Sequence, residues 1–239
     1  QKLRALSDPE RRRRILTEEP TEDPEFARFD ELLDGGNWVW EVGEVPDYEP
    51  AVEDSVAARA RRAGRDPMDF MYDLMLANEG KTLFYSARAN FDDGTLEVCR
   101  EQILNENTVI GLGDGGAHVG IICDASFPTT LLAHWGRDRT RGERIDLSYL
   151  VRKQTRDTAM AVGLTDRGVL ATGRKADINV IDFDRLNACS PEIVHDLPAG
   201  GGRFQQKATG YVANVVSGSV TYEEGVATGE LPGRLIRAS

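Results

Sequence analysis

The chain has 239 residues, 40% hydrophobic and 29% charged, a composition typical of a soluble globular protein with a sizeable core. Its 40 acidic residues outnumber its 29 basic ones, and the net charge of −11 disfavours nucleic acid and acidic membrane surfaces as partners. No apolar run reaches the roughly 18 residues that a membrane span needs. We therefore expect no nucleic-acid partner and no membrane partner.

The cysteines and the N-terminus bear on the compartment. Cys99, Cys123 and Cys189 are few and scattered, which argues against a disulfide framework and suits a reducing environment. The first residues lack the apolar stretch of a signal peptide, so the sequence predicts a cytoplasmic protein. The chain also starts without a methionine, and we expect further residues upstream of Gln1.

Helix signals begin near the N-terminus. An Asp-Pro pair at Asp8 and another at Asp66 each predict a capped helix with proline at its first position. Between them, residues 52–63 carry apolar side chains at helical spacing. The helix after Asp66 is expected to bury Phe70, Met71, Leu74 and Met75.

Strands and helices then alternate. We expect strands over residues 38–42, 81–87 and 108–112 and helices over residues 96–104 and 147–162. Strand, helix and strand in this order form the repeat of a parallel sheet, as in a barrel or an open α/β sheet. The sequence therefore predicts an α/β fold for this part.

The last third of the chain has the pattern of an antiparallel β-module. Residues 176–182 alternate with period two, and two further apolar runs flank Ser217 and Gly218, a pair typical of a hairpin turn. Residues 200–202 are three glycines, which favour a flexible loop.

Asp114 is the acid best placed for chemistry. It lies in the segment Gly-Leu-Gly-Asp-Gly-Gly-Ala-His, directly after the predicted strand over 108–112. The carboxyl ends of parallel strands face the ligand, and the flanking glycines permit a sharp turn, so Asp114 is placed to act on a substrate. An aspartate in a glycine-rich loop also often serves only to cap a turn. The residues alone leave both interpretations open.

The glycines around Asp114 also match the spacing of a dinucleotide-binding motif. Gly111, Gly113 and Gly116 have the G-x-G-x-x-G spacing and follow a predicted strand. However, an acid inside the turn would repel a pyrophosphate, no helix clearly begins at Gly116, and no second strand ends in an acid about 20 residues on. A dinucleotide site is therefore disfavoured.

The histidines do not form a metal site by themselves. His118, His134 and His195 lack the spacing of a metal-binding pair, whereas hydrolytic zinc sites need three protein ligands. His118 stands four residues after Asp114 and is a candidate substrate contact. His134 lies on an apolar stretch and is expected in the core, and His195 is expected to be structural. The sequence also lacks a G-x-S-x-G elbow, a P-loop and an H-E-x-x-H motif.

Three blocks resemble the amidohydrolase superfamily, and most closely its N-acyl-D-amino-acid deacylase (D-aminoacylase-like) branch. Residues 109–118 look like the last barrel strand with its single aspartate. Residues 166–182 look like the exit from the barrel, and residues 215–234 look like the family's tail. The resemblance is good from residue 109 onward and loose over residues 1–90.

The resemblance implies an architecture in two parts. Residues 1–163 would be the C-terminal part of a (β/α)8 TIM-type barrel of a metal-dependent hydrolase, and residues 164–239 would contribute to a small β-sandwich module. The family's metal ligands are a His-x-His, a mid-barrel Cys, Glu or modified Lys, two later His, and the Asp of the last strand. Here only Asp114 is present, so the others would lie upstream of Gln1. The N-terminal half of the same barrel would then be this chain's partner, and the chain alone is expected to be inactive.

The resemblance also implies zinc-assisted hydrolysis of a small-molecule amide. Zinc lowers the pKa of bound water to about 7 and polarises a carbonyl. Asp114 would be a zinc ligand and the base that takes the proton from this water and passes it to the leaving amine. His118 would contact the substrate. Arg137 and Arg139 are further candidates for a substrate carboxylate, although a solvated loop is the plainer role for these arginines.

Two alternatives stay open beside an N-acyl-amino-acid deacylase. One is a cyclic-amide hydrolase of the same superfamily, which a comparison of N-acyl-D-amino acids with hydantoin-like rings would separate. The other is a non-catalytic α/β scaffold fragment, which predicts that Asp114→Asn leaves all hydrolysis by the intact protein unchanged.

Overall fold

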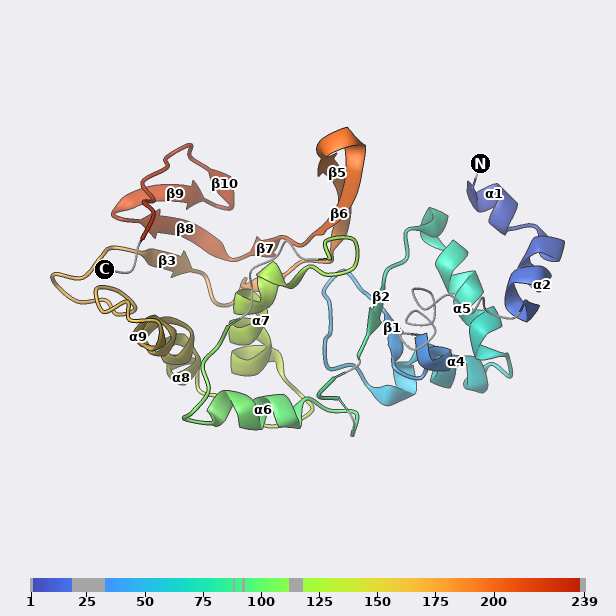
Figure 1. Cartoon of the computed structure of the whole chain (residues 1–239). Helices are drawn as coiled ribbons and strands as arrows, with labels where there is room; N and C mark the ends of the chain where they lie inside the picture. The colour runs from blue at the N-terminus through green and yellow to red at the C-terminus, as the bar shows by residue number, and fades with distance from the viewer. Residues whose placement is uncertain (1, 19–32, 88, 92, 112–117, 237–239) are drawn as a thin grey trace. The chain divides into compact units, whose positions relative to one another are not determined.

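The computed structural model describes residues 2–18, 33–87, 89–91, 93–111 and 118–236, and it has a mixed α/β fold (Figure 1). The chain divides into two compact units, Gln1–Val98 and Cys99–Ser239. The boundary expected near residue 163 concerns the domains of an intact barrel enzyme and stays a prediction.

Helices dominate the first unit. Those that the structure describes in full are α1 (Lys2–Leu6), α2 (Pro9–Thr17), α4 (Val56–Arg62) and α5 (Pro67–Leu76). Asp8 accepts the N–H of Arg11 at the start of α2, and Asp66 accepts two N–H groups at the start of α5, so both predicted caps are confirmed. Strand β1 (Val39–Glu41) pairs antiparallel with β2 (Phe84–Ser86), which confirms both strands in shortened form.

Among the described residues of the first unit, two small clusters of buried apolar side chains stand out. One joins Val39, Val56 and Met71, and the other joins Trp40, Ala87 and Phe91. The predicted burial on α5 is confirmed for Met71, while Phe70 and Leu74 are partly buried against the same cluster. Met75 stands in the last turn of α5, beyond that cluster, and is 52% exposed, so its predicted burial was wrong.

A set of ion pairs joins α2 to α5. The Arg12 guanidinium contacts Asp69 at 2.6 Å and Asp73 at 2.5 Å and lies over the Tyr72 ring, 5.2 Å from its centroid. Arg65 contacts the same two carboxylates at 2.6 and 2.5 Å. Hydrogen bonds from Arg65 to Asp69, and from Arg12 to Asp73, hold the pKa of each carboxyl below its usual range.

Helix α6 (Glu97–Leu104) spans the boundary between the units, and α7 (Phe127–Ala133), α8 (Leu147–Arg152) and α9 (Thr158–Ala161) lie in the second. The predicted helix over 147–162 is present, but its middle, Lys153–Asp157, is π-helical. Asp146 caps α8 by accepting the N–H of Tyr149. Hydrogen bonds from Ser148 and Tyr149 lower the pKa of Asp146. The buried apolar residues of the second unit are Leu131, Leu132, Ala133, Trp135, Ile145, Leu150, Ala159, Leu186 and Ala188.

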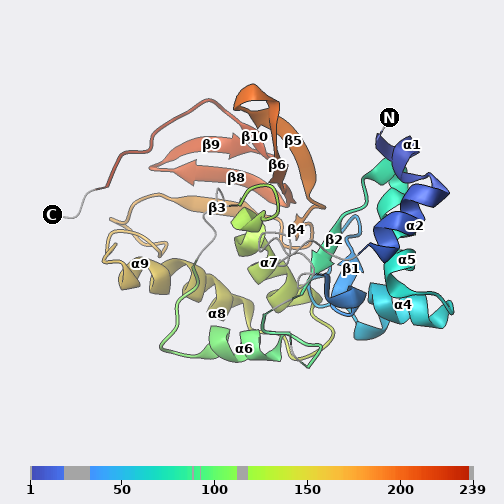
Figure 2. The same cartoon turned by 45° about the vertical axis from the view of Figure 1, so that its right-hand side comes forward.

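The predicted β-module occupies the end of the second unit (Figure 2). Its strands are β3 (Ile178–Ile181), β4 (Asn187–Ala188), β5 (Glu192–Leu197), β6 (Gly201–Gln205), β7 (Ala208–Thr209), β8 (Tyr211–Val216), β9 (Ser219–Glu223) and β10 (Val226–Ala227). Strands β10, β9, β8 and β3 form one antiparallel sheet in that order. The β8–β9 turn places Ser217 at φ 51° and Gly218 at φ 86°, which confirms the predicted hairpin.

Two segments differ from the predictions. Gly201 and Gly202 begin β6, because the reversal of the β5–β6 hairpin is completed within the preceding turn, Pro198–Gly200. Residues 108–111 form no strand, and Val109 is 53% exposed. An extended segment becomes a strand only where a neighbour supplies hydrogen bonds. Within the described ranges the strands pair antiparallel with one another, and no parallel pair occurs.

Gly210 lets two backbone segments approach closely between β7 and β8. Its φ is 86°, and a Cβ atom at this position would stand 2.5 Å from the Cα of Leu186, which is fully buried. The Gly210 carbonyl accepts the N–H of Asp182 at 2.8 Å. Only glycine fits this crossing without a shift of the backbone.

No disulfide joins Cys99, Cys123 and Cys189, all of which the structure describes. Among the described helices, none combines the length and the apolar character needed to traverse a bilayer.

Candidate functional site

The predicted catalytic residue, Asp114, lies within residues 112–117 and thus outside the described residues. Its roles as base and metal ligand stay predictions. The structure describes the chain up to Gly111 and again from His118. The residues just before and just after the undescribed segment are called its upstream and downstream flanks.

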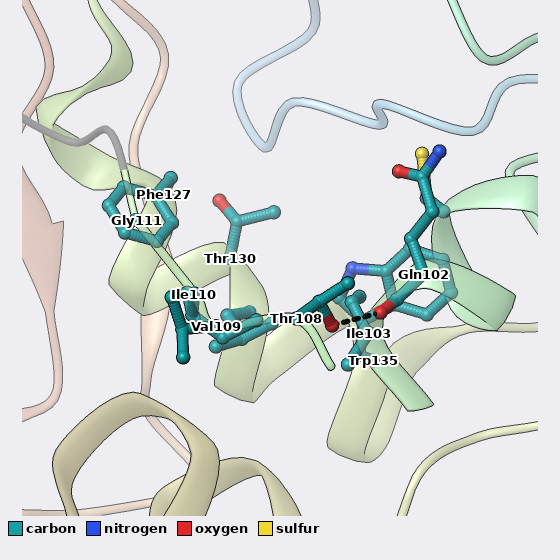
Figure 3. A pocket seen from close by; sticks show the side chains of 11 residues that line it. Gln102, Ile103, Thr108, Val109, Ile110, Gly111, Phe127, Thr130 and Trp135 are labelled. Atoms are coloured by element: carbon teal, nitrogen blue, oxygen red, sulfur yellow. Dashed lines mark hydrogen bonds between the residues drawn. The ribbon is translucent and has the colours of Figure 1, made fainter. Parts of the chain in front are cut away.

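A cavity of about 430 Å³ lies on the upstream flank, between α6, residues 108–111 and α7 (Figure 3). Its lining is mostly apolar: Ile103, Val109, Ile110, Phe127, Leu131 and Trp135. Cys99, Gln102, Thr108, Gly111 and Thr130 complete it. None of the described residues around this cavity carries a carboxylate, imidazole or ammonium group. The cavity therefore offers surface for an apolar group, and the Cys99 thiol is the ionisable side chain among its described lining residues.

A buried lysine holds the start of this flank. Lys153, only 2% exposed, donates from Nζ to the carbonyl of Asn105 at 2.6 Å and to the carbonyl of Thr108 at 2.5 Å. Lys153 was not predicted from the sequence. The available signal was its spacing, because Lys153 follows the apolar Leu147 and Leu150 at intervals of three residues and so belongs to the buried face of its helix.

The downstream flank is hydrogen-bonded to the β-module. His118 is exposed and has φ 49°, and its carbonyl accepts the N–H groups of Ile121 and Ile122 at 2.8 and 3.0 Å. The next carbonyl, of Val119, accepts the N–H of Phe204 in β6 at 2.7 Å. An exposed imidazole in this position is free to meet a ligand, and its predicted contact with substrate stays a prediction.

The other two histidines make contacts within the second unit. His134 is half-buried at the end of α7, with its ring edge-on to Trp135 at a centroid distance of 5.2 Å, as expected of a packed histidine. His195 on β5 is exposed, and its Nδ1 lies 3.3 Å from the carbonyl oxygen of Gly200 across the hairpin, a contact in keeping with a structural role.

No set of three or more His, Cys, Asp or Glu side chains within the described ranges is grouped to hold a metal ion. A hydrolytic zinc site needs three protein ligands and an open position for water. The described part of the chain therefore does not fit a metal by itself.

The two candidate arginines make several contacts within the second unit. Arg137 pairs with Asp138 and donates to the carbonyls of Phe183 and Leu186, and its pKa is raised, foremost by the Asp138 hydrogen bond. Arg139 is 2% exposed, and its guanidinium lies 4.7 Å from the centroid of Trp135. Arg139 also donates to the Glu143 carbonyl at 2.9 Å. The expectation of solvated side chains in a loop was wrong, because both guanidinium groups bond to neighbouring backbone.

Comparison with known proteins adds one result. A family model described as "Amidohydrolase family" matches residues 32–222, which cover most of both compact units. Neither a search of curated proteins nor a search of solved structures found a match.

Proposed function

The chain belongs to the amidohydrolase family, a family of generally metal-dependent hydrolases, and on this premise we propose that it is part of an enzyme that hydrolyses non-peptide C–N bonds in small amides. The observation that supports the proposal is the family match over residues 32–222, which runs through Asp114 and His118. Within the family we favour an N-acyl-amino-acid deacylase, as in the D-aminoacylase-like branch.

The proposed architecture extends beyond this chain. We propose that the helices and extended segments up to residue 163 are the C-terminal part of a (β/α)8 barrel, and that residues 164–239 contribute to a β-sandwich module. Zinc is the proposed metal, and we propose that the N-terminal half of the barrel supplies its ligands other than Asp114. The unbridged cysteines suit a cytoplasmic enzyme.

The proposed chemistry assigns one proton path to Asp114. A water oxygen attacks the amide carbonyl carbon, Asp114 accepts a proton from that water, and the same proton moves to the nitrogen as the C–N bond breaks. The products are a carboxylic acid and an amine. A well-placed acid–base group contributes about 10²–10⁴-fold to the rate. His118 is proposed to contact the substrate beside this group.

The test uses the intact protein, with any residues that precede Gln1, and a panel of N-acyl-D-amino acids and hydantoin-like rings. We expect hydrolysis of the N-acyl compounds and a loss of about 10²–10⁴-fold in kcat for Asp114→Asn. Asp54→Asn is the control, because the Asp54 side chain is 70% exposed in the first unit, and it should leave kcat unchanged.

Each alternative gives a distinct result in this assay. Turnover of the rings alone would indicate a cyclic-amide hydrolase. Equal activity of wild type and Asp114→Asn would remove the catalytic role of Asp114 and favour a scaffold fragment. Tight stoichiometric zinc binding by residues 1–239 alone would contradict the proposed division of the ligands.

A further inference from the structure

The apolar cavity of the second unit has two walls that are each one face of a helix. Side chains three or four positions apart lie on the same side of a helix. The run formed by α7 and the π-helical turn His134–Asp138 contributes such a set. It comprises Phe127, Thr130, Leu131 and Trp135. Cys99, Gln102 and Ile103 of α6 have the same spacing, and residues 108–111 complete the cavity (Figure 3).

Trp135 is buried, but its polar atom has no protein partner in the described part of the chain. The residue is 6% exposed, and its ring lies edge-on to His134 and 4.7 Å from the Arg139 guanidinium. Among the residues that the structure describes, none accepts a hydrogen bond from the indole N–H. Figure 3 shows the indole nitrogen on the side of the ring that faces the cavity. Because a buried indole N–H usually finds an acceptor, this donor points to a ligand that supplies one.

The rest of the lining determines the polarity of such a ligand. The Thr130 hydroxyl lies on the same helix face as Trp135, forms no hydrogen bond within the described ranges, and can donate or accept one. None of the described lining residues is an aspartate, glutamate, lysine, arginine or histidine. A charged ligand group would lose its hydration in this cavity without gaining a counter-ion, and that loss is costly. The cavity therefore favours a neutral ligand.

We propose that this cavity binds a small neutral molecule with an aromatic body and a carbonyl oxygen, and that this oxygen accepts the Trp135 N–H. The indole N–H can only donate, so the ligand must supply the acceptor. Phe127 and Trp135 provide aromatic surface for its body. The volume of about 430 Å³ lies near the lower end of the range of about 300–1,000 Å³ that is usual for small-molecule sites. The binding site consists of described residues alone and is independent of the proposed hydrolysis.

The first experiment is an NMR titration of the full chain with acetophenone, a neutral aromatic ketone. The chain has three tryptophans and hence three indole N–H signals, and the signal missing from Trp135→Phe belongs to Trp135. We expect acetophenone to shift this signal saturably, with a Kd of about 1 mM, as is usual for a small fragment. The signals of Trp38 and Trp40, both in the first unit, should not move. A larger shift at Trp38 or Trp40, or no saturable shift at Trp135 up to the solubility of acetophenone, would overturn the proposal.

The second experiment tests the hydrogen bond by comparing acetophenone with ethylbenzene, which has a similar apolar body and no oxygen. Affinities are measured from the methyl signals of Ile103 and Leu131, so that the variant without the indole can be included. Trp135→Phe should weaken acetophenone by about 3–10-fold, the loss of one hydrogen bond, and ethylbenzene by less than about twofold. Trp38→Phe makes the same change in the first unit and should leave both affinities unchanged. Equal losses of the two ligands in Trp135→Phe would overturn the proposal.

Two further measurements do not depend on the folding of Trp135→Phe. Ile110→Trp places a larger side chain in the cavity from a half-buried position, and it should weaken acetophenone by about tenfold or more. Benzoate keeps the aromatic ring and the acceptor oxygens but carries a charge, and it should bind the wild-type chain about tenfold more weakly than acetophenone or worse. Unchanged affinity of acetophenone for Ile110→Trp, or benzoate binding as tight as that of acetophenone, would overturn the proposal.

Discussion

Gly210 and Gly218 share a φ of 86° but stand in different surroundings. At Gly218 an added Cβ would meet no atom within 4 Å, whereas at Gly210 it would meet the Leu186 backbone at 2.5 Å. Alanine substitutions at these two glycines therefore distinguish two contributions to the loss of stability. One is the strain of a left-handed backbone, and the other is a steric clash.

We expect Gly218→Ala to lower the free energy of unfolding by about 1–2 kcal/mol, the usual cost of a non-glycine residue in this conformation. Gly210→Ala should cost at least about 3 kcal/mol, because the backbone at Leu186 must shift as well. Urea unfolding followed by circular dichroism measures both. Equal losses for the two variants would contradict the close approach at Gly210.

Single residues were predictable from the sequence where their contacts are local. Asp8 and Asp66 were expected as helix caps, because a cap bonds N–H groups two or three residues away. Lys153 was missed, because its partners Asn105 and Thr108 lie more than forty residues away in sequence. A charged residue on an apolar helix face shows that a buried partner exists, but it does not identify the partner.

At the scale of elements, helices and hairpins were predictable and strand pairing was not. The β8–β9 hairpin was found from its turn residues, and α6 from its periodicity. Residues 108–111 have the composition of a buried strand but no paired neighbour among the described residues. Composition records a preference for extended backbone, while a sheet also needs a second segment that local sequence does not specify.

The attachment of α2 to α5 should depend on pH. Asp69 and Asp73 have lowered pKa values in the folded chain, so their ion pairs contribute stability above the unfolded-state pKa of about 3.9. That contribution is lost as pH falls through the lowered values. We expect Arg12→Ala to lower stability by about 1 kcal/mol or less at pH 7, since the carboxylates are partly exposed.

The measurement is urea unfolding from pH 7 to pH 2.5. The difference between wild type and Arg12→Ala should stay constant down to about pH 5 and shrink below about pH 4, where the carboxyls become protonated. Arg14→Ala is the control on the same helix, because its 3.5 Å pair with Glu18 is largely exposed and should contribute little. A difference that persists at pH 2.5 would exclude the ion pairs as its source.

At the scale of the whole molecule, the family match and the compact units divide the chain differently. The match over residues 32–222 crosses the unit boundary after Val98, so one family domain contains parts of both units. Each unit nevertheless has buried apolar residues of its own. Separate cores favour separate cooperative unfolding.

We therefore expect two thermal transitions in calorimetry of the 239-residue chain. Met71→Ala should lower only the transition of the first unit, and Leu150→Ala only that of the second, each by about 2–5 kcal/mol of local stability. Both side chains are almost fully buried in their own unit. A single transition that both variants lower equally would contradict independent unfolding.

The burial of Lys153 has a practical consequence for such measurements. Amine-reactive reagents modify lysines that reach solvent, and the side chains of Lys81, Lys175 and Lys207 are 75, 26 and 67% exposed. Lys153, at 2%, should stay unmodified until its helix separates from α6. The extent of Lys153 acylation, measured by mass spectrometry at increasing temperature, would then show when the second unit opens. This measurement needs no label added to the chain.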